Sequence, residues 1–130
     1  FWTEPGAGVV KGWSPGLAEP KVLAESLTEV DAIAVDASHV YFTTKNDLMR
    51  VAKSGGEPVL LAQSPAFSPS IDMDSSHVYW VYDEEVFRVL KSGGDKEQVA
   101  KEKPVGPGIA VDETHVYWAG LAQILKLVHD

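Results

Sequence analysis

A 38-residue period runs through this 130-residue chain and constrains its fold more than any other feature. Three segments share the pattern Ile-x-x-Asp-x-Ser/Thr-His-Val-Tyr followed by Phe or Trp, and they align without gaps at 33–42, 71–80 and 109–118. Their histidines mark the period, because 77 − 39 and 115 − 77 both equal 38. Further downstream, 53–56 and 91–94 both read Lys-Ser-Gly-Gly, and a degraded earlier copy begins at Phe1. The chain is therefore a tandem of similar units.

Each unit has the pattern of four short strands. In the unit that begins at Ile33, we expect strands at 33–35, 39–43, 48–52 and 58–63. The Gly-Gly pair at 55–56 is typical of a hairpin turn, since glycine takes positive φ without steric cost. No useful stretch has helical periodicity. The sequence predicts an all-β chain of antiparallel sheets.

Both faces of each predicted sheet are apolar enough to need cover. Val40 and Phe42 point to one face, and Tyr41 and Thr43 point to the other. Stacking such sheets around an axis covers both faces, so a β-propeller is favoured over a stacked sandwich.

The strand count gives a single propeller segment over 1–130 with about three and a half four-stranded blades. The blades fall at about 1–28 (partial), 29–66, 67–104 and 105–130 (partial). Propellers typically close with about four to eight blades. We therefore expect the chain to be part of a larger propeller, or to complete a ring with a second copy, the first being favoured.

Residues 1–4 read Phe-Trp-Thr-Glu, and Ile-Ala-Val-Asp at 109–112 is followed by Val-Tyr-Trp at 116–118. These motifs resemble the YWTD-type propeller repeats of lipoprotein-receptor ectodomains, and the bacterial group of YWTD-like and domain-of-unknown-function 5050-type repeats. The resemblance covers nearly the whole chain. It implies a β-propeller and a secreted, periplasmic or cell-surface bacterial protein, but little about function, because the shared residues build the blade.

The chain departs from the YWTD pattern at the fourth position of the motif. That position holds Glu4, Thr44, Tyr82 and Gly120 in the four copies. The Asp contact that the family makes between blades is therefore expected to be absent or remade.

Composition excludes several function classes. A formal net charge of −8, from 19 acidic and 11 basic residues, argues against nucleic acid and anionic membranes as partners. The absence of cysteine removes disulfides, thiolate zinc sites and cysteine nucleophiles. No apolar run approaches the roughly 18 residues of a membrane span.

The repeated polar residues are expected to serve the scaffold. Equivalent histidines on stacked sheets would be about 10 Å apart, whereas zinc ligands lie about 2 Å from the metal. The repeated aspartates precede Ser or Thr in a turn, where a carboxylate accepts backbone N–H groups. The repeated cations are expected to pair with acceptors between blades, the aspartates being candidates. These sets are His39, His77 and His115; Asp36, Asp74 and Asp112; and Arg50, Arg88 and Lys126. No catalytic residue, metal or cofactor is predicted.

Residues that break the repeat are the better candidates for a site. Asp72 replaces Ala34 and Ala110 in the predicted innermost strand, where it would meet water, an ion or a polar ligand; a solvated channel residue is the favoured interpretation. The loops between second and third strands vary freely and share one rim with the connections between units. The candidate binding residues are Asp72, Lys45, Asn46, Tyr82, Asp83 and Glu84.

Three functions are compatible with these observations. We favour a non-enzymatic scaffold that binds a protein or carbohydrate through its rim loops. One alternative is a metal-dependent lactonase- or lyase-like propeller enzyme with Asp72 as a channel carboxylate. The other is a structural half-propeller that assembles with itself into a closed ring.

Overall fold

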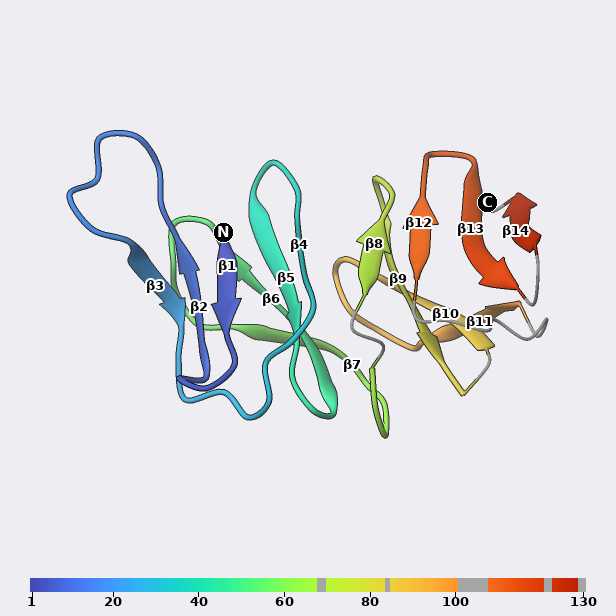
Figure 1. Ribbon diagram of the computed structural model, residues 1–130, viewed down its shortest axis with the longest axis horizontal. Helices are drawn as coiled ribbons and strands as arrows, with labels where there is room; N and C mark the ends of the chain where they lie inside the picture. The colour runs from blue at the N-terminus through green and yellow to red at the C-terminus, as the bar shows by residue number, and fades with distance from the viewer. Residues whose placement is uncertain (68–69, 84, 101–107, 121–122, 129–130) are drawn as a thin grey trace. The chain divides into compact units, whose positions relative to one another are not determined.

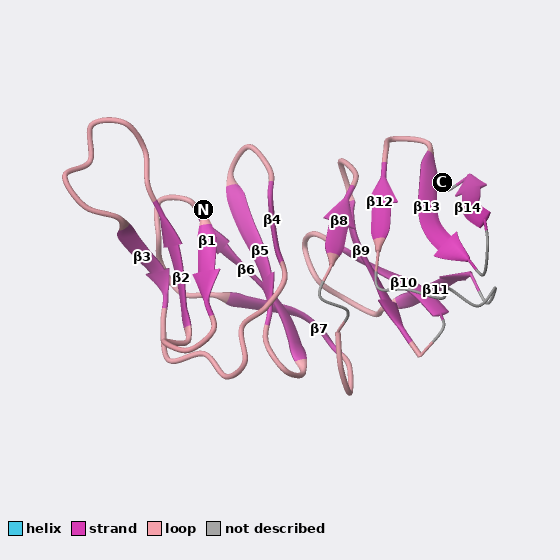
Figure 2. Cartoon of the chain, in the orientation of Figure 1, coloured by secondary structure: helices cyan, strands magenta, loops and turns pink. Residues whose placement is uncertain are grey.

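The computed structural model describes residues 1–67, 70–83, 85–100, 108–120 and 123–128. Within these ranges the chain is all-β, with strands β1 to β14 in four antiparallel sheets and no helix (Figures 1 and 2). The chain divides into two compact units, Phe1–Pro65 and Ala66–Asp130. Each unit contains two sheets.

The first unit begins with a three-stranded sheet in the order β1-β2-β3, formed by Trp2–Glu4, Val9–Gly12 and Lys21–Ala24. Its second sheet has the order β4-β5-β6-β7, formed by Ile33–Val35, His39–Thr43, Asp47–Ala52 and Val59–Gln63.

The second unit begins with a four-stranded sheet, β8-β9-β10-β11, formed by Ile71–Met73, His77–Tyr82, Glu85–Leu90 and Glu97–Ala100. Its other sheet has the order β12-β13-β14, formed by Ile109–Val111, His115–Gly120 and Gln123–Val128.

The strands predicted for the unit at Ile33 are confirmed with small shifts. β4 and β5 have the predicted bounds. β6 begins one residue earlier, at Asp47, which pairs with Gln63. β7 begins one residue later, at Val59, because Pro58 has no N–H to donate to a strand ladder. The predicted hairpin glycines, Gly55 and Gly56, have φ of 93° and 120°.

The sheets also repeat an irregularity that the sequence pattern did not reveal. The register shifts at Val10/Lys11, where β2 pairs with β3, at Leu48/Met49, where β6 pairs with β7, and at Val86/Phe87, where β10 pairs with β11. These positions are spaced by the same 38 residues. A β-bulge increases local twist, so these three sheets are twisted at the same position of the repeat.

Each sheet has two faces, which we name by the residues of the repeat. The tyrosine face is the side to which Tyr41, Tyr79 or Tyr117 points, and the valine face is the side of Val40, Val78 or Val116. The faces of β1–β3 are assigned from the matching strand pairs. Thr3 pairs with Val10 in the same way as Val81 pairs with Val86, and Val81 lies on the tyrosine face of its sheet. The Thr3–Val10 pair therefore lies on the tyrosine face of β1–β3. Trp2 and Lys11 then lie on the valine face.

Within each unit, the tyrosine face of the first sheet packs against the valine face of the second sheet. In the first unit, Val10, Leu23 and Ala24 of β1–β3 form a core with residues on the valine face of β4–β7: Val40, Phe42 and Val51. In the second unit, the tyrosine face of β8–β11 packs on the valine face of β12–β14, with a core of Tyr79, Val81, Val86, Ile109, Val116 and Trp118. The stacking rule is therefore the same: a tyrosine face receives the valine face of the next sheet.

Candidate functional site

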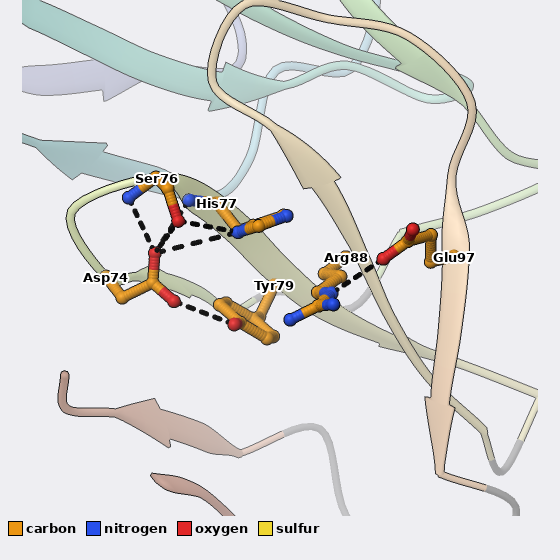
Figure 3. Close-up of polar contacts among 6 residues, drawn as sticks. All are labelled: Asp74, Ser76, His77, Tyr79, Arg88 and Glu97. Atoms are coloured by element: carbon orange, nitrogen blue, oxygen red, sulfur yellow. Dashed lines mark hydrogen bonds and ion pairs between the residues drawn. The ribbon is translucent and has the colours of Figure 1, made fainter. Parts of the chain in front are cut away.

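A hydrogen-bonded cluster recurs at the start of the second strand in three of the sheets, and Figure 3 shows the copy around Asp74. Asp74 Oδ1 accepts the backbone N–H groups of Ser76 and His77, both at 2.7 Å. Its other oxygen, Oδ2, accepts the hydroxyl of Tyr79 at 2.7 Å. The carboxylate therefore closes the turn between β8 and β9 and orients a buried tyrosine.

The other two copies have the same bonds. Asp36 accepts N–H groups at 2.9 Å from both Ser38 and His39, and the Tyr41 hydroxyl at 2.9 Å. Asp112 accepts the equivalent N–H groups at 2.7 Å and the Tyr117 hydroxyl at 3.0 Å. The predicted turn role of these aspartates is confirmed.

Burial and hydrogen bonding set the acidity of these groups. Burial alone would raise the pKa of Asp74, but the N–H groups of His77 and Ser76 and the Tyr79 hydroxyl outweigh it and hold that pKa below its ordinary value. Burial raises the pKa of Tyr79 to about 12, and the hydrogen bond to Asp74 adds to the rise. At neutral pH the pair is a carboxylate that accepts from a neutral phenol.

The cluster contains Asp, Ser and His but is not arranged as a nucleophilic triad. Ser76 Oγ lies 2.7 Å from His77 Nδ1 and 3.1 Å from Asp74 Oδ1, whereas Asp74 Oδ1 and His77 Nδ1 are 4.0 Å apart. In a triad the histidine lies between serine and carboxylate and takes the serine proton. Here the serine lies between them. When its single proton is donated to Asp74, His77 Nδ1 must be the donor to Oγ and cannot act as its base.

The repeated cation in the second copy pairs within its own sheet. Arg88 Nε donates to Glu97 Oε2 on β11 at 2.8 Å, and Figure 3 shows the guanidinium between Glu97 and Tyr79. Burial alone would lower the pKa of Arg88, but its hydrogen bonds to Tyr79 and Glu97 raise it. Arg88 therefore joins the turn cluster to the edge strand β11.

Asp72 connects the two sheets of the second unit. Its Oδ1 accepts the N–H of Met73 at 2.8 Å, and its Oδ2 accepts the N–H of Val111 in β12 at 2.8 Å. Alanine stands at the equivalent positions of β4 and β12 and cannot make this link. The carboxylate predicted to face a channel is thus half-buried, and both of its oxygens accept backbone N–H groups.

Lys45 and Asn46 lie in the β5–β6 loop and tie it to two other connections of the first unit. The Lys45 backbone N–H donates to Thr28 O at 3.2 Å, between β3 and β4. The Asn46 side-chain amide donates to Ser64 O at 3.3 Å and Pro65 O at 2.9 Å, after β7. Ser64 N–H donates back to Asn46 O at 3.0 Å. Three connections distant in sequence therefore form one surface, which we call the rim cluster.

The remaining predicted site residues belong to the second unit. Tyr82 ends β9 and is half-buried opposite Glu85. Asp83 is exposed with φ of 48°, and in the described part of the chain it makes no hydrogen bond or ion pair. Glu84 lies outside the described residues.

Trp2 and Trp80 differ in the surroundings of their indole rings. Glu4 accepts the indole N–H of Trp2 at 3.0 Å and pairs with Lys11 at 3.0 Å. Trp80, which is followed at the same spacing by Tyr82, is fully buried, and within the described chain its Nε1 has no acceptor. The indole N–H of Trp2 is therefore bound by a neighbour on its own strand.

The sequence pattern did not predict two hollows on the surface. Phe1, Trp13 and Leu17 are exposed around a small hollow of about 70 Å³, with Lys53 Nζ 5.4 Å from the centre of the Phe1 ring. The other is an open hollow of about 330 Å³ on β12–β14. The sequence contained a signal for the first hollow. Leu17 stands 38 residues before Gly55, so a large apolar residue occupies a position that is a turn glycine in the next copy of the repeat.

Within the described ranges, no three His, Asp or Glu side chains are close enough together to hold a metal ion. Among the same residues, no helix has the length and apolar character needed to cross a membrane. The chain matches no protein-family model, and no curated protein matches it with significant similarity.

Proposed function

We propose that the four sheets are blades of a β-propeller segment, and that the chain is a non-enzymatic binding module with two separate protein-binding surfaces, the rim cluster of the first unit and the exposed Asp83 of the second. The 38-residue period supports the blade interpretation, as does the stacking of a tyrosine face on a valine face in both units. The resemblance to secreted YWTD-type repeats supports an extracytoplasmic location.

The anchoring of the rim cluster carries this proposal. Its backbone and Asn46 hydrogen bonds fix three connections in place, while the Lys45 and Glu29 side chains remain exposed as an ion pair of 3.5 Å. A loop that is already ordered loses little conformational entropy on binding. A rigid scaffold with variable, ordered loops is the usual arrangement of a binding protein.

Backbone conformation points to the same loops. Among the described residues, the non-glycine residues with positive φ are Ser26, Glu29 and Asp83, at 60°, 51° and 48°. All three lie in connections at the ends of the sheets. Such conformations are unfavourable for residues with a Cβ and are concentrated at functional sites.

The chemistry of the rim favours a protein over a carbohydrate. Four exposed side chains of these loops are charged or amide groups: Glu29, Lys45, Asn46 and Asp83. Polar and charged side chains surround the core of most protein interfaces. The exposed aromatic residues Phe1 and Trp13 lie elsewhere, at the start of β1 and in the β2–β3 loop.

The enzymatic alternative rested on Asp72. Both oxygens of this carboxylate accept backbone N–H groups, one of them in the adjacent sheet. This is the role of a structural link, so we do not propose catalysis.

Charge reversal on the rim tests the proposal. The folded chain would be screened against a protein array and a glycan array, together with Lys45→Glu, Asp83→Lys and the control Glu57→Lys. Glu57 is exposed in the β6–β7 turn, at the opposite end of its sheet from the β5–β6 loop. We expect saturable binding to a protein that both rim variants weaken and the control retains.

Two results would overturn the proposal. One is binding to a glycan, or to any ligand, that is unaffected by both rim variants. The other is turnover of a lactone or ester substrate that Asp72→Asn abolishes without unfolding the chain.

A further inference from the structure

The tyrosine face of β12–β14 is uncovered in the second unit. Ile124 on this face is 73% exposed, whereas Val86, which stands 38 residues earlier on the covered face of β8–β11, is 0% exposed. Val81 is likewise buried on the covered face, and its counterpart Ala119 is half-exposed. An apolar face of the kind that is core in both units is therefore left open here.

This open face is also hollowed. The hollow of about 330 Å³ is lined by small and apolar residues: Gly108, Ile109, Ala110, Tyr117, Trp118, Ala119 and Ile124. Ala110 and Ala119 stand where β8–β11 has the larger residues Asp72 and Val81. The smaller side chains make room for a large group from an incoming sheet.

The covered tyrosine face shows what such a face receives. On β8–β11, Tyr79, Val81 and Val86 form a core with Ile109 and Trp118 from the next valine face. Two further tryptophans occupy that position, Trp80 and Trp2. Trp2 pairs with Lys11 in β1–β2 as Trp80 pairs with Phe87, and it lies half-buried on the valine face of β1–β3.

We propose that the tyrosine face of β12–β14 binds the valine face of β1–β3 of a second copy of this chain, with Trp2 entering the hollow beside Ala119 and Ile124. The proposal rests on the blade interpretation made under Proposed function. It continues the sheet-on-sheet contact that both units already contain, with the same faces in the same order. A head-to-tail contact gives a closed ring where the rotation between copies closes and an open filament where it does not; the assembly that we propose is the ring of two copies.

Solution mass tests the assembly directly. Light scattering on the purified chain, from micromolar to submillimolar concentration, should give twice the 14.1 kDa chain mass. Ile124→Asp should give a monomer with an unchanged circular dichroism spectrum, because a residue this exposed adds little to the fold of one chain. The matched control is Leu60→Asp, another exposed aliphatic residue (48%), which should remain dimeric.

Cross-linking tests which faces meet. The chain has no cysteine, so introduced thiols are unique. The double variant Lys11→Cys/Ile124→Cys, treated with a short bis-maleimide, should give a covalent dimer, while each single variant should not. A dimer from Ile124→Cys alone would mean that two tyrosine faces meet and would overturn the head-to-tail order.

A chain that stays at 14.1 kDa over the whole concentration range, or a dimer that survives Ile124→Asp, would also overturn the proposal. Failure here is distinguishable from failure of the proposed function, because rim binding is read separately. A monomer that binds its partner through Lys45 overturns the assembly alone, and a dimer that binds no protein overturns the function alone.

Discussion

Asp36, Asp74 and Asp112 make the same hydrogen bonds at different depths. Asp74 is 6% exposed and its partner Tyr79 is fully buried. The side chain of Asp112, in contrast, is 52% exposed. Water can replace a lost partner at the exposed copy but not at the buried one. The repeat thus provides a matched series in which chemistry is constant and burial varies.

Removing the buried carboxylate should be the most damaging change of this series. Asp74→Ala leaves the Tyr79 hydroxyl and two turn N–H groups without their acceptor, and we expect it to lower the free energy of unfolding by about 3 kcal/mol. Asp112→Ala should cause a clearly smaller loss. Urea unfolding followed by circular dichroism measures both losses. Equal losses would show that burial does not determine how much these hydrogen bonds contribute to the free energy of unfolding.

The lowered pKa of Asp74 also predicts an acid dependence of stability. Because the folded-state pKa lies below the unfolded value of about 3.9, this carboxylate's contribution is complete above that value and is lost as pH falls through the folded-state pKa. Unfolding free energy should therefore drop below about pH 4. In Asp74→Asn the drop should be shallower, and an identical pH profile would contradict the assignment.

At the scale of elements, the molecule is organised by links between segments that are distant in sequence. Asp72 joins β8 to β12, and Asn46 joins the β5–β6 loop to the segment after β7. The bulges at Leu48/Met49 and Val86/Phe87 twist the outer strands in the same way. These features convert a set of hairpins into packed sheets with ordered loops.

Replacement of Asp72 separates a structural role from a binding role. Asp72→Ala removes the acceptor for Met73 and Val111 and should lower the unfolding free energy by about 2 kcal/mol. Alanine at the equivalent position Ala34 shows that the strand itself tolerates the change. The control Asp83→Ala, in an exposed loop, should stay within about 0.5 kcal/mol of the parent. Unchanged stability in Asp72→Ala would contradict the link.

At the scale of the whole molecule, charge opposes self-assembly while apolar surface favours it. Each chain carries a formal net charge of −8, so two copies repel each other. The proposed contact itself joins Trp2 to a hollow lined by Ala119 and Ile124. The balance between charge repulsion and apolar contact, and with it the fraction of dimer, should depend on the salt concentration.

Added sodium chloride should increase the dimeric fraction, because salt screens the repulsion between acidic chains and leaves the apolar contact intact. Sedimentation velocity at fixed protein concentration and rising salt measures this fraction, with Ile124→Asp as the monomeric reference. Dissociation by salt would instead show that ion pairs hold the copies together, which the proposed interface does not predict.

The sequence by itself determined the period, the strands of each unit, the glycine turns and the role of the aspartates. These features depend on alternation along a strand and on hydrogen bonds that span two to five residues, as from Asp74 to Ser76, His77 and Tyr79. It also located Lys45 and Asn46 in a loop, because such loops break the repeat. Only the tertiary structure decided that Asp72 accepts from Val111, 39 residues away, and that one apolar sheet face stays open. Those facts depend on which sheet packs against which, and a residue's own neighbours in sequence do not carry that information.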